Sequence, residues 1–133
     1  MQKIYLKGLA ITKMNIKQIK HFFKNDYHRL VLMTGGKTTP IDLTNKSRLG
    51  YYQNVFNVVS ITIAEMENTP RHPYKKIIVE RFINHNRLQD LEPLIGYRHS
   101  ATCKKINEAL VCFATELQRQ QIKYNFYPLI EFE

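Results

Sequence analysis

The sequence predicts a mostly α-helical protein, a helical domain whose C-terminal half carries a helix-turn-helix. Three observations predict this class. Apolar residues recur every three or four positions in several segments, the spacing that places them on one face of a helix. Glycines and prolines stand between these segments and mark turns. After Gly96, a basic stretch opens the longest amphipathic segment, as in the second half of a helix-turn-helix.

The composition is typical of one globular domain, with or without an appendage. The chain has 133 residues, of which 44% are hydrophobic, and this content argues against disorder. Its longest apolar run, residues 58–64, is interrupted by two hydroxyl residues, so we expect no membrane span. The N-terminus has a lysine but no sustained apolar core or small-residue cleavage site, so we expect no signal peptide. Cys103 and Cys112 fit no zinc spacing. We expect them to be small buried side chains in a reducing cytosol.

The charge is strongly positive and unevenly placed. The formal net charge is +9, and residues 1–50 hold ten lysines and arginines against two acids. An excess of this kind favours a polyanionic partner, most often nucleic acid. A basic protein that is merely soluble has the same composition, so charge alone leaves both interpretations open.

The first elements read as an arm followed by a basic helix. Residues 1–14 alternate loosely and are compatible with a short strand or an ordered arm. Asn15 and Gln18 resemble a capping box, and the helix they begin ends before Gly35. Its basic side is either solvated or in contact with phosphates, and we assign residues 1–48 to this arm and helix. The apolar side is Ile16, Ile19, Phe22, Phe23, Tyr27 and Leu30, and the basic side is Lys17, Lys20, Lys24 and Arg29.

The middle of the chain predicts a connector and two further helices. Residues 34–48 are rich in turn formers, and their Gly-Gly-Lys-Thr run lacks the earlier glycine of a phosphate-binding loop because Val31 stands there. A helix over about 50–67 is rich in β-branched residues, so burial must hold it. Pro73 suits the first turn of a helix over 74–83. We assign residues 49–123 to a helical helix-turn-helix domain and 124–133 to a tail.

The segment around Gly96 predicts the helix-turn-helix itself. Pro93 fits only a first turn, so the short helix begins near Asp90. Gly96 supplies the positive φ of a tight turn, and the next helix begins near His99, with Ser100 as the better cap. An inward stripe leaves the other side chains for base and phosphate contacts. The stripe is Cys103, Ile106, Leu110, Phe113 and Leu117; Glu108 also faces outward, and the candidate DNA-binding residues are Arg87, Arg98, His99, Ser100, Ala101, Thr102, Lys104 and Lys105.

The sequence carries no pattern typical of catalysis. There is no carboxylate pair, nucleophile triad or metal-ligand spacing, and the five histidines have no ligand-like pairing. We therefore expect no enzyme activity, no cofactor and no metal. An ordinary solvated helix face over residues 98–108 is the alternative to DNA contact.

Residues 55–117 resemble the fourth-region DNA-binding domain of bacterial sigma factors. They resemble more closely the ArpU-type phage transcriptional regulators, which are related to the RinA-type activators. The resemblance is carried by Ile-Ile-Val-x-Arg-Phe at 77–82, Leu-Ile-Gly-Tyr at 94–97, and Glu-Ala-Leu at 108–110 with Phe-Ala at 113–114. Residues 22–43 are similar to the start of that family. Two positions depart from the family pattern: Arg98 replaces a capping serine, and Glu92 replaces a small residue.

The resemblance implies a phage or prophage transcriptional regulator that binds promoter-region duplex DNA through a sigma-region-4-like helix-turn-helix. It places the recognition helix on residues 98–105 and leaves contact with RNA polymerase and homodimerisation open. A small DNA-packaging (terminase) subunit is one alternative. Another is a helical protein-interaction module that does not bind DNA, in which the aromatic tail packs on a partner unless it folds back on its own core.

Overall fold

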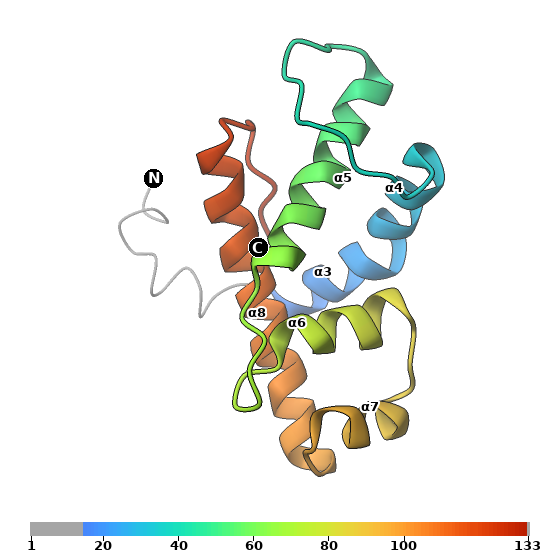
Figure 1. The fold of residues 1–133 in the computed structure, drawn as a ribbon, viewed down its shortest axis with the longest axis vertical. Coiled ribbons are helices and arrows are strands. Elements are labelled where there is room, and N and C mark those ends of the chain that lie inside the picture. Colours follow the sequence, from blue (N-terminus) through green and yellow to red (C-terminus); the bar gives the residue numbers. More distant parts are fainter. Residues whose placement is uncertain (1–14, 133) are drawn as a thin grey trace.

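The computed structural model describes residues 15–132 (Figure 1). These residues are mostly α-helical, as predicted, and none of them forms a β-strand. The strand or arm expected over residues 1–14 lies outside the described residues. In the described part, no helix has the length and the apolar character needed to cross a bilayer. The elements are α3 (Ile16–His21), η1 (Phe22–Asp26), α4 (Tyr27–Thr34), α5 (Arg48–Glu65), α6 (Tyr74–Ile77), η2 (Ile78–Ile83), α7 (Leu88–Ile95) and α8 (His99–Lys123), where η marks a π-helical stretch.

Residues 16–34 form one continuous helix, made of α3, η1 and α4. Its cap is the expected one, because Asn15 Oδ1 accepts a hydrogen bond from the Gln18 N–H at 3.2 Å. In the π-helical stretch the Tyr27 N–H donates to the Phe22 carbonyl, five residues back. This wider turn keeps the aromatic side chains at both ends of the stretch on the core side.

The central helix is α5, which spans nearly the range expected for it. Ser47 caps it by accepting a hydrogen bond from the Gly50 N–H at 3.0 Å. Val58 and Val59 are buried, as a helix so rich in β-branched residues requires. In Figure 1 the first turns of α5 form one end of the molecule.

Two buried asparagines of α5 hold the connector before it. The Asn54 side chain accepts from the Asp42 N–H at 3.0 Å and donates to the Asp42 carbonyl at 2.8 Å. The Asn57 side chain accepts from the Thr39 N–H at 2.9 Å. A buried amide needs hydrogen-bond partners, and the connector supplies them. The connector is therefore attached to α5 at two points.

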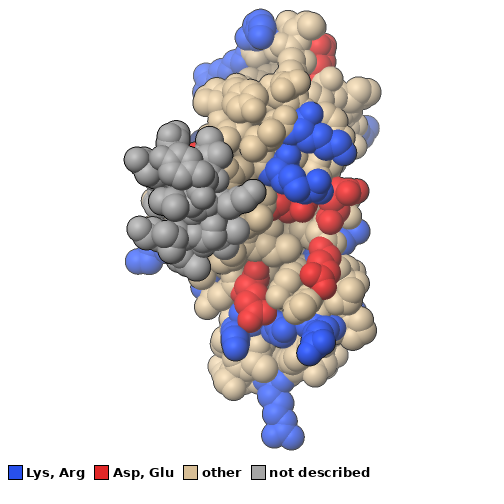
Figure 2. All heavy atoms as spheres, turned by 90° about the vertical axis from the view of Figure 1, so that its left-hand side faces the viewer, with Lys and Arg blue, Asp and Glu red and all other residues tan. Residues whose placement is uncertain are grey.

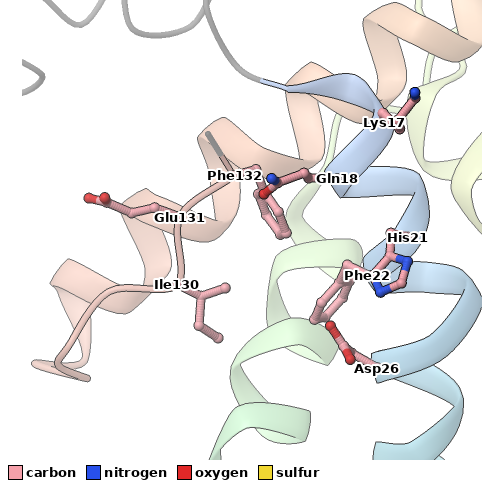
Figure 3. Close-up of a pocket in the computed structure, with 8 residues that line it drawn as sticks. All are labelled: Lys17, Gln18, His21, Phe22, Asp26, Ile130, Glu131 and Phe132. Carbon is pink, nitrogen blue, oxygen red and sulfur yellow. The ribbon is translucent and has the colours of Figure 1, made fainter.

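The tail after α8 folds back on the protein's own core. Phe132 is buried, its ring centroid 5.6 Å from that of Phe22, and Figure 3 shows Ile130 and Phe132 facing the first helix. The Ile130 N–H donates to Gln121 Oε1 at 2.8 Å. Of the two arrangements considered for the tail, the protein adopts the one that closes its own core.

The C-terminal part contains α6–η2, α7 and α8, with α7 lying beside the first turns of α8 at the end of the molecule opposite the start of α5 (Figure 1). The helix expected over 74–83 is α6–η2. The prediction that the next helix begins near Asp90 is wrong, because α7 begins at Leu88. Asp90 does not cap it; its carboxylate pairs with Arg87 at 2.9 Å. Pro93 therefore lies in the second turn.

Candidate nucleic-acid interface

The connection between α7 and α8 is three residues long and begins with Gly96. Leu91 and Ile95 anchor α7 in the core, and the Gly96 N–H donates to the Glu92 carbonyl at 2.9 Å. Gly96 has φ of +78°, a left-handed conformation that favours glycine. A short helix, a three-residue turn with glycine and a long helix follow one another in the predicted order, and their assignment as a helix-turn-helix stays a prediction.

Tyr97, in the middle of this turn, ties it to the loop before α6. Its hydroxyl donates to the Pro70 carbonyl at 2.9 Å. The Tyr97 ring also lies 5.4 Å from the Lys105 ammonium. The start of α8 is therefore held in place by a contact with a segment 27 residues earlier in the chain.

One face of the first turns of α8 is exposed and polar. Ser100, Lys104 and Asn107 follow one another at helical spacing on this face, and Arg98 precedes it in the turn. Neither Arg98 nor Lys104 pairs with an acid among residues 15–132. Asn107 was not among the predicted site residues, although its spacing of three from Lys104 marks it.

Two other basic side chains near this face contact acidic neighbours. Arg87 pairs with Asp90 at 2.9 Å, and a ring nitrogen of His99 lies 3.1 Å from the Glu92 carboxylate. On the face drawn in Figure 2, basic side chains at the lower end stand next to acidic ones. The candidate interface therefore combines a polar surface with Arg98 and Lys104, which have no acidic partner within residues 15–132, instead of forming a broad basic patch.

The prediction that Thr102 faces outward is wrong. Its side chain is fully buried, and its hydroxyl donates to the Tyr97 carbonyl at 3.2 Å. The inward stripe of α8 begins at Thr102, one turn before Ile106, while Cys103 lies half-buried at its edge. A hydroxyl that reaches a free carbonyl of the preceding turn can be buried without a large penalty, and hydrophobic spacing alone does not reveal this.

Lys105 also departs from the expected outward position. Its side chain is only 17% exposed, and its ammonium donates to the Arg71 carbonyl at 2.9 Å and lies 3.5 Å from Glu108. Glu108 in turn accepts a hydrogen bond from the Tyr74 hydroxyl at 2.9 Å. Burial, followed by this hydrogen bond, raises the pKa of Tyr74. Lys105 therefore connects the first turns of α8 to the loop before α6. Its ammonium already contacts protein groups and is not available for phosphates.

The start of α8 differs slightly from the preferred prediction. The helix begins at His99, with Arg98 in the N-cap position, so Ser100 lies in the first turn and does not cap it. Arg98 makes no side-chain cap hydrogen bond. Ala101 is half-buried, while Arg87, His99 and Ser100 are exposed.

His99 forms a contact chain that the sequence did not reveal. One ring nitrogen faces Glu92, and the other lies 3.8 Å from the sulfur of Cys103. Because these partners contact different nitrogens of one ring, the three side chains do not converge on a single point. Within the described residues, no group of three or more histidine, cysteine and acidic side chains is placed to hold a metal ion.

The predicted site residues thus divide into two groups. The exposed ones are at or near the surface of the turn and the first turns of α8, and two are built into the structure behind it. The exposed set is Arg87, Arg98, His99, Ser100 and Lys104, with Ala101 half-buried, and the internal set is Thr102 and Lys105.

Comparison with known proteins does not identify a family. No protein-family model, no curated protein and no solved structure matches this chain. The similarity to ArpU-type regulators therefore stays a prediction.

Proposed function

We propose that this protein binds duplex DNA, with the first turns of α8 in the major groove and α7 lying across the groove behind it. The observation that carries the proposal is the exposed polar face formed by Ser100, Lys104 and Asn107, with Arg98 at its start. The opposite side of the same turns is buried, so the face is presented by a rigid helix. The first turns of α8 also lie at one end of the molecule (Figure 1), where a duplex can approach.

Each exposed side chain has a defined chemical role in this proposal. Arg98 can donate two hydrogen bonds to guanine, and Asn107 can bond adenine through its amide. Ser100 bonds either a base edge or a phosphate. Lys104 supplies a phosphate contact, which positions the helix without reading sequence. Thr102 and Lys105 support the helix from behind and touch no DNA.

The biological setting we propose is control of phage or prophage genes. Its support is the resemblance carried by residues 77–82, at the end of α6 and in η2, and by residues 94–97, at the end of α7 and in the turn after it. Contact with RNA polymerase belongs to the same proposal. A packaging subunit would instead form a ring, so the native mass of the protein separates the two roles: a monomer or dimer supports a regulator, and a larger closed ring contradicts it.

The experiment is a titration of the protein on duplex DNA from its own upstream region and on random duplex, each at several salt concentrations. Binding that tightens on its own DNA and weakens with salt supports the proposal, since each phosphate contact adds about 0.9 to the slope of log affinity against log salt. The matched variants are Lys104→Ala and Lys123→Ala, which remove one exposed lysine from opposite ends of α8. Equal losses for both variants, or no dependence on salt, would contradict it.

A further inference from the structure

The helix over residues 16–34 has a second basic surface, separate from the start of α8. Its exposed side carries several cations, and Asp26 is its single acid. No cation of this helix pairs with an acid among residues 15–132. These basic side chains are Lys17, Lys20, Lys24 and Arg29, with His21 and His28 beside them.

The buried side of this helix fixes which of its residues face solvent. Ile19 and Phe23 are almost fully buried on its other side, so the helix cannot rotate without opening the core. The π-helical stretch widens one turn, and residues four apart therefore drift less around the axis than in an α-helix. Lys20 and Lys24, which are four residues apart and both exposed, therefore share the exposed side of the helix.

The spacing of the lysines suits a nucleic-acid backbone. Lys17 and Lys24 are seven residues apart, which is about 10 Å of helix axis at 1.5 Å per residue. That length corresponds to about three steps of one DNA strand at 3.4 Å per step. Figure 3 shows the Lys17 amine directed away from the tail segment that packs on the other flank of the helix.

The two basic surfaces differ in how far their charge is neutralised. Around α8, Arg87, His99 and Lys105 each have an acidic partner. On the first helix the lysines have none among the described residues, and exposed charges of this kind attract counterions from solution. A phosphate backbone displaces such counterions, and their release favours binding.

We propose that the face formed by Lys17, Lys20 and Lys24 is a second contact surface for duplex DNA, which binds phosphates and adds affinity for any sequence. It does not depend on base reading by α8, because its contacts are made by a different helix. Its contribution is electrostatic and disappears at high salt.

The test compares two triple variants of the full chain that change the net charge equally. One is K17Q/K20Q/K24Q. The other is K37Q/K46Q/K123Q, which removes three exposed lysines from the connector and the end of α8. All six lysines are exposed, and circular dichroism with thermal unfolding verifies that both variants fold. The readout is the salt slope of binding to random duplex DNA.

The first variant is expected to lower that slope by about 2 to 3, since three phosphate contacts contribute about 0.9 each. The second variant is expected to leave it nearly unchanged. Discrimination between the protein's own upstream DNA and random DNA should persist in the first variant, because the lysines touch no bases. That separation keeps the two proposals distinguishable: loss of discrimination with Arg98→Ala tests α8, and loss of slope tests the first helix.

Three results would overturn the inference. An unchanged slope in the first variant means that these lysines are only solvated. Equal decreases in both variants mean that net charge, and not this face, controls binding. Weaker binding to vesicles of anionic lipid, with unchanged binding to DNA, assigns the face to a membrane surface instead.

Discussion

Arg98 and Lys104 are exposed cations without an acidic partner in the described part of the chain; Lys104 lies on the polar face of α8 and Arg98 precedes it in the turn. Their side chains differ in geometry. A guanidinium makes two parallel hydrogen bonds to guanine, whereas an ammonium acts as a point charge. The two residues should therefore affect DNA binding in different ways.

Lys104→Ala is expected to weaken binding by a similar factor on any duplex, because a phosphate contact carries no sequence information. Arg98→Ala is expected to change the preference between the protein's own upstream DNA and random DNA, by the equivalent of about 1–3 kcal/mol if Arg98 reads a base. Competition binding with both duplexes measures this. Equal losses on both duplexes for Arg98→Ala would remove Arg98 from base reading.

A substitution of Thr102 tests whether this residue supports α8 from within instead of contacting DNA. Its hydroxyl is buried and donates to the Tyr97 carbonyl. Thr102→Val keeps the shape but removes that hydrogen bond, so the free energy of unfolding should fall by about 1 kcal/mol. DNA affinity of the folded variant should not change. A variant of unchanged stability with weaker DNA binding would restore Thr102 to the interface.

At the scale of elements, the periodic apolar pattern predicted the helices well because each helix buries one face. The helix over 16–34 and α6–η2 match their predicted ranges closely. The starts of α7 and α8 were harder to predict from the sequence. Both have an arginine in the N-cap position with no side-chain cap, so the usual capping residues pointed to later starts.

The turn between α7 and α8 depends on Gly96, whose φ of +78° is the left-handed conformation. A Cβ added at Gly96 would meet no atom within 4 Å, so the cost of a substitution lies in the backbone alone. Gly96→Ala should lower the free energy of unfolding by about 1 kcal/mol, and Gly96→Asn by less. Chemical denaturation measures both. Equal losses for alanine and asparagine would show that the strain lies elsewhere.

At the scale of the whole molecule, contacts between distant segments determine the positions of side chains that the sequence pattern did not predict. Lys105 is fixed by the carbonyl of Arg71, 34 residues earlier, and Tyr97 by that of Pro70. The spacing of apolar residues along α8 does not indicate partners so distant in sequence, so Lys105 was expected at the surface. The exposure of Ser100 and Lys104 was predictable because they lie opposite the hydrophobic stripe of α8.

The tail joins the two ends of the described chain into one core. Phe132 packs near Phe22 of the first helix and Phe113 of α8. Phe132→Ala should lower the free energy of unfolding by about 3–5 kcal/mol, because it leaves a cavity in an aromatic cluster. Tyr127→Ala is the matched control in the same tail, since Tyr127 is 59% exposed. If the two variants were equally stable, the tail would not contribute to the core.

The most direct measurement of the central claim is a titration of the isotope-labelled protein with duplex DNA from its own upstream region, followed by NMR of the backbone amides. The largest shift changes are expected over residues 98–107, at the turn and the first turns of α8, with the buried middle of α5 little affected. Saturable binding that leaves the amides of residues 98–107 unshifted would contradict the proposed placement of α8 in DNA.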